Sequence, residues 1–155
     1  MMRMKMRELL FRGQQRKKGE KVRLDGSPLE SSWFYGNGIF QTKGDFSIIY
    51  QSEPEFSKHS VYSDTLGQYT GLTDKHGTKI FEGDIVVYCT NTNRATNKEF
   101  HEVVFETRGE SGYFGIKISN IETWRFCLEV PAKLMEVVGN IYDNPELLDG
   151  GDKNA

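Results

Sequence analysis

The most restrictive feature of the sequence is a short apolar run, Ile85 to Cys89, which directly follows the glycine turn Glu82-Gly83-Asp84. Five consecutive apolar residues in an extended strand leave neither face suited to water. This is also the longest uninterrupted apolar run in the chain, far short of the ~20 residues that a membrane helix requires. The run therefore predicts a strand buried on both faces, in a protein that does not span a membrane.

The composition agrees with a chain built from strands. Apolar residues make up 37% of the 155 positions and aromatic residues 12%, with more Phe, Tyr, Val and Ile than Ala and Leu. Sixteen glycines against four prolines indicate many tight turns. Short strands between glycine corners predict an all-β protein with a minor helix, arranged as a barrel or a sandwich.

The amino-terminal segment is predicted to be a basic hairpin. Residues 1–24 hold nine Lys or Arg against two acids, a local charge of +7, whereas the whole chain carries −2. Arg7–Arg12 is the expected strand, Gly13–Gly19 the turn and Lys21–Leu24 the returning strand. Such an asymmetry is typical of a nucleic-acid contact or of a solvated hairpin that keeps a protein soluble. The basic residues put forward as partner contacts are Arg12, Arg16, Lys17, Lys18 and Lys21.

A second hairpin is predicted from an aromatic segment and the strand that follows it. Trp33–Phe40 has a turn-forming Gly-Asn-Gly at its centre. In Phe46–Tyr50, alternate residues place Phe46, Ile48 and Tyr50 on one face. The polar stretch Gln51–Ser60 is then the expected linker between two halves of the chain.

The second half predicts the remaining strands and two defined turns. In Asp74-Lys75-His76-Gly77, the Asp side chain accepts hydrogen bonds from downstream amides and Gly takes a positive φ. Gly139 predicts a bulge or a close backbone approach, and Asn144 with Pro145 predicts the cap and first residue of a helical turn. The other expected segments are a loop at Asn91–Lys98 and strands at Glu102–Glu106, Tyr113–Ile118, Trp124–Leu128 and Glu136–Tyr142.

Residues able to carry chemistry form no complete catalytic motif. Cys89 and Cys127 lack the paired spacing of a zinc site, and without a signal peptide they indicate a reduced cytosolic setting. Glu82 and Asp84 would either hold Mg²⁺ for phosphodiester hydrolysis or bond to turn amides, and the turn role is preferred because it is routine. The sequence contains no phosphate loop, nucleophile elbow or dinucleotide fingerprint. It predicts no cofactor and no enzyme, with a metal-dependent hydrolase as the alternative.

Four motifs follow one another in order along most of residues 6–148: Met6–Gly13, Trp33–Gly36, Gly67–Val86 and Val137–Leu148. Together they closely resemble the YopX family of small phage and prophage proteins. The resemblance implies a two-part β protein whose second half is an SH3-type barrel, and it implies a bacterial host. It brings no reaction, because the family has no established activity.

These inferences combine into one expected organisation and role. A hairpin region over residues 1–60 packs on an SH3-like barrel over 61–148, and residues 149–155 form a disordered tail. We expect a non-enzymatic binding or accessory module in the bacterial cytoplasm that contacts protein or nucleic acid, with homo-oligomers formed through strand edges. The aromatic residues put forward for stacking or peptide contact, most of them also expected in the core, are Trp33, Tyr35, Tyr69 and Trp124.

Overall fold

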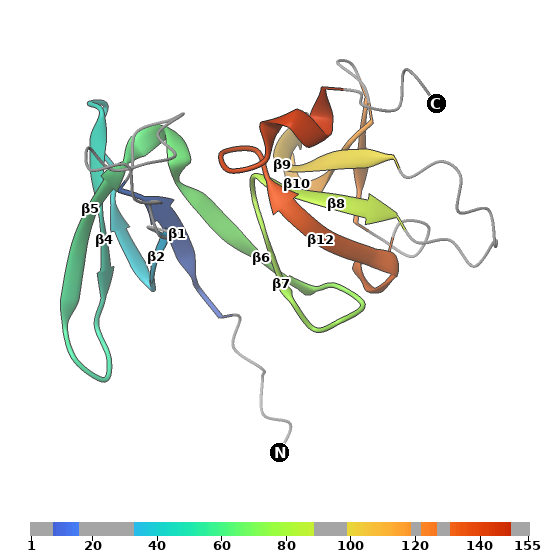
Figure 1. The fold of residues 1–155 in the computed structure, drawn as a ribbon. Helices are drawn as coiled ribbons and strands as arrows, with labels where there is room; N and C mark the ends of the chain where they lie inside the picture. The colour runs from blue at the N-terminus through green and yellow to red at the C-terminus, as the bar shows by residue number, and fades with distance from the viewer. Residues whose placement is uncertain (1–7, 16–32, 89–98, 119–121, 127–130, 150–155) are drawn as a thin grey trace, which may run out of the picture. The chain divides into compact units, whose positions relative to one another are not determined.

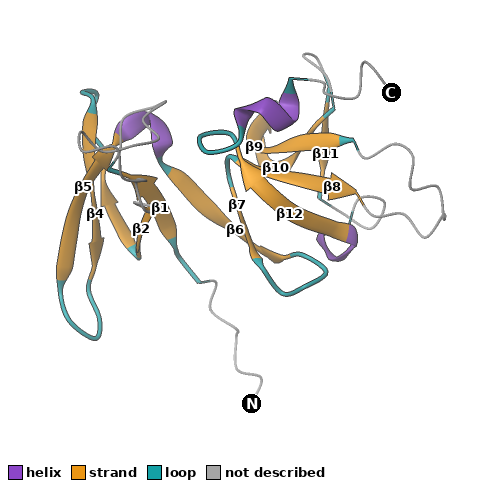
Figure 2. Ribbon diagram, viewed as in Figure 1, coloured by secondary structure: helices purple, strands orange, loops and turns teal. Residues whose placement is uncertain are grey.

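The structure, a computed structural model, consists mainly of β-strands (Figures 1 and 2). It describes residues 8–15, 33–88, 99–118, 122–126 and 131–149. The helical elements in these ranges are 3₁₀ turns of three or four residues, and no helix there is long and apolar enough to cross a membrane. The prediction of an all-β protein with a minor helix is confirmed.

The chain divides into two compact units, residues 1–71 (unit 1) and 72–155 (unit 2). The division falls inside strand β6 (Gly67–Thr73). The first residues of β6 pair with β1 (Phe11–Gln14), and its other neighbour in the sheet is β7 (Lys79–Phe81). The remaining strands of unit 1 are β2 (Trp33–Gly36), β3 (Gly38–Phe40), β4 (Phe46–Gln51) and β5 (Ser57–Tyr62), and those of unit 2 are β8 (Asp84–Tyr88), β9 (Phe100–Arg108), β10 (Ser111–Lys117), β11 (Thr123–Arg125) and β12 (Met135–Asn140).

Unit 1 contains the antiparallel sheet β3-β4-β5, one face of which packs against strands β1 and β2. Ile49 and Val61 on this covered face are fully buried. They meet two glycines of the opposing strands, because a Cβ at Gly13 would lie 2.7 Å from Val61 Cγ2 and one at Gly36 2.5 Å from Ile49 Cγ2. The missing side chains let the two layers approach closely, so among the described residues the core of unit 1 lies under one face of β4.

Unit 2 is an antiparallel sheet in the order β11-β10-β9-β8-β12. Its edge strands β11 and β12 do not pair with each other within the described residues, so the sheet is not a closed barrel there and the SH3-type closure stays a prediction. Ile85, Val86 and Val87 of β8 are all buried, which confirms the strand expected to be covered on both faces. The core cluster comprises Ile80, Val86, Val103, Ile116, Ala132 and Met135.

The bulge predicted at Gly139 is present. The register of β12 against β8 shifts between Val137 and Gly139, and a Cβ at Gly139 would lie 2.5 Å from Asn144 Oδ1. The predicted helical turn also begins at Pro145, as a 3₁₀ turn over Pro145–Leu148. Asn144 is the N-cap residue of this turn, as predicted, and its carbonyl accepts a hydrogen bond from the Leu147 amide at 3.1 Å. Its side chain makes no capping bond, however, because its Oδ1 accepts a hydrogen bond from the Asn140 amide at 3.2 Å and so holds the end of β12.

The predicted limits of the first strand are wrong. β1 begins at Phe11 rather than Arg7 and continues through Gly13 and Gln14, which were expected in the turn. Gln14 is 2% exposed, and its amide donates to Thr65 Oγ1 at 2.8 Å, so this polar residue is buried with its backbone satisfied. The expected returning strand, the Asn91–Lys98 loop and the tail beyond residue 149 lie outside the described residues.

The predicted linker over Gln51–Ser60 is also wrong. Gln51 ends β4, and β5 pairs with β4 residue by residue from Gln51↔Ser57 to Phe46↔Tyr62. β5 is an edge strand of its sheet, and only Val61 of it is fully buried. An edge strand with one open face tolerates polar residues, which is why its composition is that of a linker.

Candidate partner-binding surface

The face of the β3-β4-β5 sheet opposite the core is largely apolar. Strand pairing aligns Phe40 with Ile48 and Ile48 with Ser60, and it aligns Gly38 with Tyr50 and Tyr50 with Lys58. Cross-strand partners point to the same side of a sheet, so these rows share one surface. We call it the outer face; it consists of Gly38, Phe40, Phe46, Ile48, Tyr50, Lys58, Ser60 and Tyr62, with Phe56 beside Tyr50.

Five large side chains of the outer face are open to solvent. Phe40 is 65% exposed, Phe46 50%, Ile48 36%, Tyr50 37% and Phe56 69%. With about 200 Å² for a whole aromatic side chain, they expose on the order of 500 Å² of largely apolar surface. That places the outer face near the upper end of the roughly 300–600 Å² found for the largest patch on a monomer, and such patches often mark interaction sites.

Strand β4 carries apolar side chains on both faces, whereas the usual antiparallel strand buries an apolar face and solvates a polar one. Ser47 is 1% exposed on the covered side, while Phe46 and Ile48 lie on the open side. The Ser47 hydroxyl is satisfied there, because it accepts a hydrogen bond from the Thr42 amide at 3.1 Å and shares one with Ser63 Oγ at 2.7 Å. The exposed rings are therefore not the result of a shifted register.

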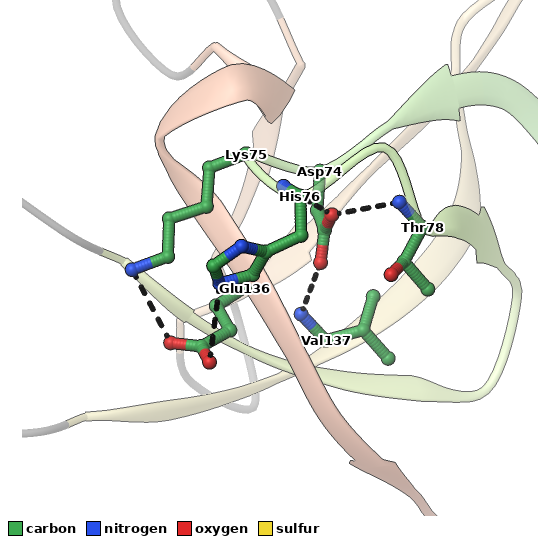
Figure 3. A network of polar contacts seen from close by, with 6 residues as sticks. All are labelled: Asp74, Lys75, His76, Thr78, Glu136 and Val137. Atoms are coloured by element: carbon green, nitrogen blue, oxygen red, sulfur yellow. Dashed lines mark hydrogen bonds and ion pairs between the residues drawn. The ribbon is translucent and has the colours of Figure 1, made fainter.

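Unit 2 contains a separate, polar site centred on Asp74, which is 1% exposed (Figure 3). Its Oδ1 accepts from the amides of His76 at 2.8 Å and Thr78 at 2.9 Å, and its Oδ2 from the amide of Val137 at 2.9 Å. Burial by itself raises the pKa of Asp74, but these three hydrogen bonds and the charge of His76 bring it below its ordinary value. Gly77 has a φ of +81°, so the turn at Asp74–Gly77 has the predicted conformation. The hydrogen bond from the Val137 amide also joins this turn to β12.

Beside this turn, Glu136 of β12 lies next to the ammonium group of Lys75 and the imidazole of His76 (Figure 3). Its carboxylate lies 3.4 Å from Lys75 Nζ and 3.6 Å from His76 Nε2. All three side chains are well exposed, so these ion pairs add little to stability. The arrangement fixes a hairpin against β12 and contains no nucleophile with a general base.

The geometry around Glu82 and Asp84 agrees with the turn interpretation of Asp84. Gly83 has a φ of +85°, and the buried Asp84 carboxylate accepts a hydrogen bond from the Phe81 amide at 2.8 Å. In the part of the chain that the structure describes, no group of three or more His, Cys, Asp or Glu is placed to hold a metal ion. Cys89 and Cys127 lie outside those ranges.

Two residues put forward as partner contacts are buried. Tyr69 is 6% exposed and belongs to the core. Arg12 is also 6% exposed, and its guanidinium carbon lies 4.5 Å from the centre of the Trp33 ring. The guanidinium of Arg12 is thus placed over an indole ring and away from solvent, and its role as a nucleic-acid or partner contact stays a prediction.

The other aromatic candidates are more accessible. Tyr35 is 50% exposed and pairs across β1–β2 with Arg12, whereas Trp33 is half-buried. Trp124 is 46% exposed, and its Nε1 donates to Glu122 Oε1 at 2.7 Å. The basic residues proposed with them lie outside the described ranges: Arg16, Lys17, Lys18 and Lys21.

The residues of the outer face were absent from the site predicted by sequence. Alternation placed Phe46, Ile48 and Tyr50 on one face correctly, but an apolar face is ordinarily the buried one. The available signal lay elsewhere, in Gly13 and Gly36, whose missing side chains leave room for the opposite face of β4.

Fold and surface together define a small antiparallel β-sheet protein with an exposed apolar sheet face. The chain belongs to the YopX family. Residues 27–149 match this family, which is described as YopX protein. It is also similar to a solved structure, protein EF1440 from Enterococcus faecalis, with 24% identity and a TM-score of 0.44 over 90% of this chain and 97% of that one. No curated protein matches the chain.

Proposed function

We propose that this protein is a non-enzymatic binding or accessory module, encoded by a phage or prophage, that acts in the cytoplasm of its bacterial host. The observation that supports this role is the outer face, where Phe40, Phe46 and Phe56 are each at least half exposed. Exposed rings gathered on one rigid sheet are typical of an interaction surface.

The chemistry of the outer face favours a protein partner over nucleic acid. Lys58 is the one cation among the residues that make up this face. Affinity for nucleic acid comes largely from several Lys or Arg side chains that neutralise phosphates, and Arg12 is already stacked on Trp33. A protein surface with apolar side chains of its own matches the outer face better.

The SH3-type barrel suggested for unit 2 forms part of the same proposal. Its support is the antiparallel order β11-β10-β9-β8-β12 and the apolar cluster on one side of this sheet. In such a barrel, the partner-binding role would lie outside the closed core, on exposed side chains and loops.

Capture from host cells tests the proposal. Tagged wild-type protein is compared with Phe46→Ser on the outer face and with Phe105→Ser, a matched control in unit 2 with 48% exposure against 50% for Phe46. We expect a protein, either from the host or an untagged copy of this chain expressed alongside, that is retained by the wild type and by Phe105→Ser, is lost with Phe46→Ser, and rebinds as a purified protein. Equal retention by all three would reject the outer face as the site.

Fluorescence anisotropy with labelled DNA and RNA checks the other partner class. If the basic residues in 1–24 contacted about six phosphates, affinity would fall around a thousandfold between 50 and 200 mM salt. We expect no such steep binding. A thousandfold salt dependence would transfer the proposed role from the outer face to the basic segment.

A further inference from the structure

We infer that the outer face docks onto the outer face of a second copy of this chain, with a two-fold axis running along β4. This inference rests on the proposed function, because it names the partner of the same surface. Two sheets then pack face to face as an aligned sandwich, which is a standard arrangement for antiparallel sheets. One face of β4 would be covered by its own chain and the other by its copy.

The size of the outer face fits a protein dimer. Its five exposed apolar side chains present on the order of 500 Å². A standard stable interface buries about 800 Å² on each partner, and the polar remainder is supplied by a rim. Lys58, Ser60 and Tyr62 belong to the same face and supply such a rim. A single extended peptide along one strand would cover only part of three strands of exposed side chains.

The strand register makes the outer face complementary to itself. Across the sheet, one row runs from the large Phe40 through Ile48 to the small Ser60. A two-fold axis along β4 reverses the order of the strands, so Phe40 of each copy lies over Ser60 of the other and Ile48 lies over Ile48. On either side of the axis, the large Phe40 therefore opposes the small Ser60, so this row is complementary to itself, as in an isologous interface.

The next row runs from Gly38 through Tyr50 to Lys58, so the axis places Lys58 of each copy near the β3 edge of the other. The Tyr50 ring covers Gly38 at that edge, because a Cβ on Gly38 would lie 2.1 Å from Tyr50 Cζ. The aliphatic part of Lys58 can pack on the outer side of this ring while its ammonium group reaches solvent past the edge. The charge of the face is thus kept at the rim and away from the centre.

Charge-pair variants at the axis test this arrangement. Light scattering coupled to size exclusion, over a range of protein concentrations, should give twice the monomer mass for the wild type. Ile48→Glu and Ile48→Lys each place like charges against each other, and each should weaken dimerisation by about a hundredfold or more. An equal mixture of the two variants should restore the dimer, because Glu then faces Lys.

A matched control tests whether a new charge disrupts the dimer only when it lies on the outer face. Leu72→Glu changes a side chain of similar exposure, 38% against 36% for Ile48, and should leave the dimer intact. Circular dichroism confirms that each variant is folded, and Phe40→Glu serves as a second disrupting variant. A monomeric wild type, a dimer that survives Ile48→Glu, or a mixture that stays monomeric would each overturn the inference. A monomeric wild type that still captures a host protein through Phe46 would leave the proposed function standing, whereas a dimer without host capture would confine the outer face to self-association.

Discussion

Strands β4 and β8 carry similar apolar residues but use them in opposite ways. In unit 2, Ile85 and Val86 point to opposite faces of β8, and both are fully buried. In unit 1, Ile49 is fully buried, whereas Ile48 beside it is 36% exposed. The difference shows that unit 2 covers both sides of β8, while among the described residues of unit 1 one apolar face of β4 stays exposed.

The largest expected effect compares an acidic side chain at these two positions. Ile85→Asp buries an unpaired carboxylate and should lower the free energy of unfolding by more than about 4 kcal/mol. Ile48→Asp leaves its carboxylate in water and should cost about 1 kcal/mol. Thermal and urea unfolding at low protein concentration measure both values. Equal losses of unfolding free energy would show that Ile48 and Ile85 do not differ in burial as described.

Next in size is the loss of the Asp74 carboxylate. Asp74→Ala leaves the amides of His76, Thr78 and Val137 without their acceptor and should cost about 3 kcal/mol. Asp74→Asn keeps one acceptor oxygen and should cost roughly half as much. Urea unfolding measures both, with the exposed Asp45→Ala expected to change stability by less than about 0.5 kcal/mol. A negligible effect of Asp74→Ala would show that pairing with β8 and apolar packing hold β12 in place without Asp74.

A smaller effect is expected at the buried cation of unit 1. Arg12→Lys keeps the charge but loses the planar group that stacks on Trp33, and it should cost about 1 kcal/mol. The exposed Arg125→Lys is the control and should be nearly neutral. If the two substitutions lower the free energy of unfolding equally, stacking of Arg12 on Trp33 does not contribute to the stability of unit 1.

The pH dependence of unit 2 should be smaller still. Because the pKa of Asp74 is lowered in the folded state, its charged form stabilises the protein fully above its ordinary value near 3.8. This contribution is lost as the pH falls through that value and then through the lower folded-state pKa. The stability difference between wild type and Asp74→Asn should therefore narrow from pH 7 to pH 3. A difference that widened in acid would contradict the lowered pKa.

The smallest expected effect concerns metal ions. Asp84 is 2% exposed and accepts a hydrogen bond from the Phe81 amide, so its carboxylate is engaged in a turn. Millimolar Mg²⁺ or Mn²⁺ should leave the melting temperature of wild type and Glu82→Ala equally unchanged. A melting temperature that rises with metal in the wild type but not in Glu82→Ala would support the alternative hypothesis, a metal-dependent hydrolase that uses Glu82 and Asp84.

Features decided by neighbouring residues were predictable from the sequence. The turns at Gly77 and Gly83 depend on short-range hydrogen bonds and on the positive φ of glycine. Gly139 was informative because a side chain there would meet Asn144, only five residues along the chain. The doubly buried β8 was predictable because five apolar residues in a row admit no solvated face.

Features decided by distant partners were not predictable in the same way. Arg12 is buried because Trp33, twenty-one positions along the chain, supplies a ring for its guanidinium. Alternation in β4 shows which residues share a face, but it does not say which face the glycines of β1 and β2 will cover. The edge position of β5 made a paired strand look like a linker. The outer face was missed for these reasons.

The location of the unit boundary limits how the protein can be dissected. A cut after residue 60 would remove Val61, which is fully buried against Gly13, from the first fragment. A cut after residue 71 would sever β6, leaving an incomplete strand on each piece. Experiments that assign a role to either half are therefore better done with point substitutions in the intact chain than with truncated fragments.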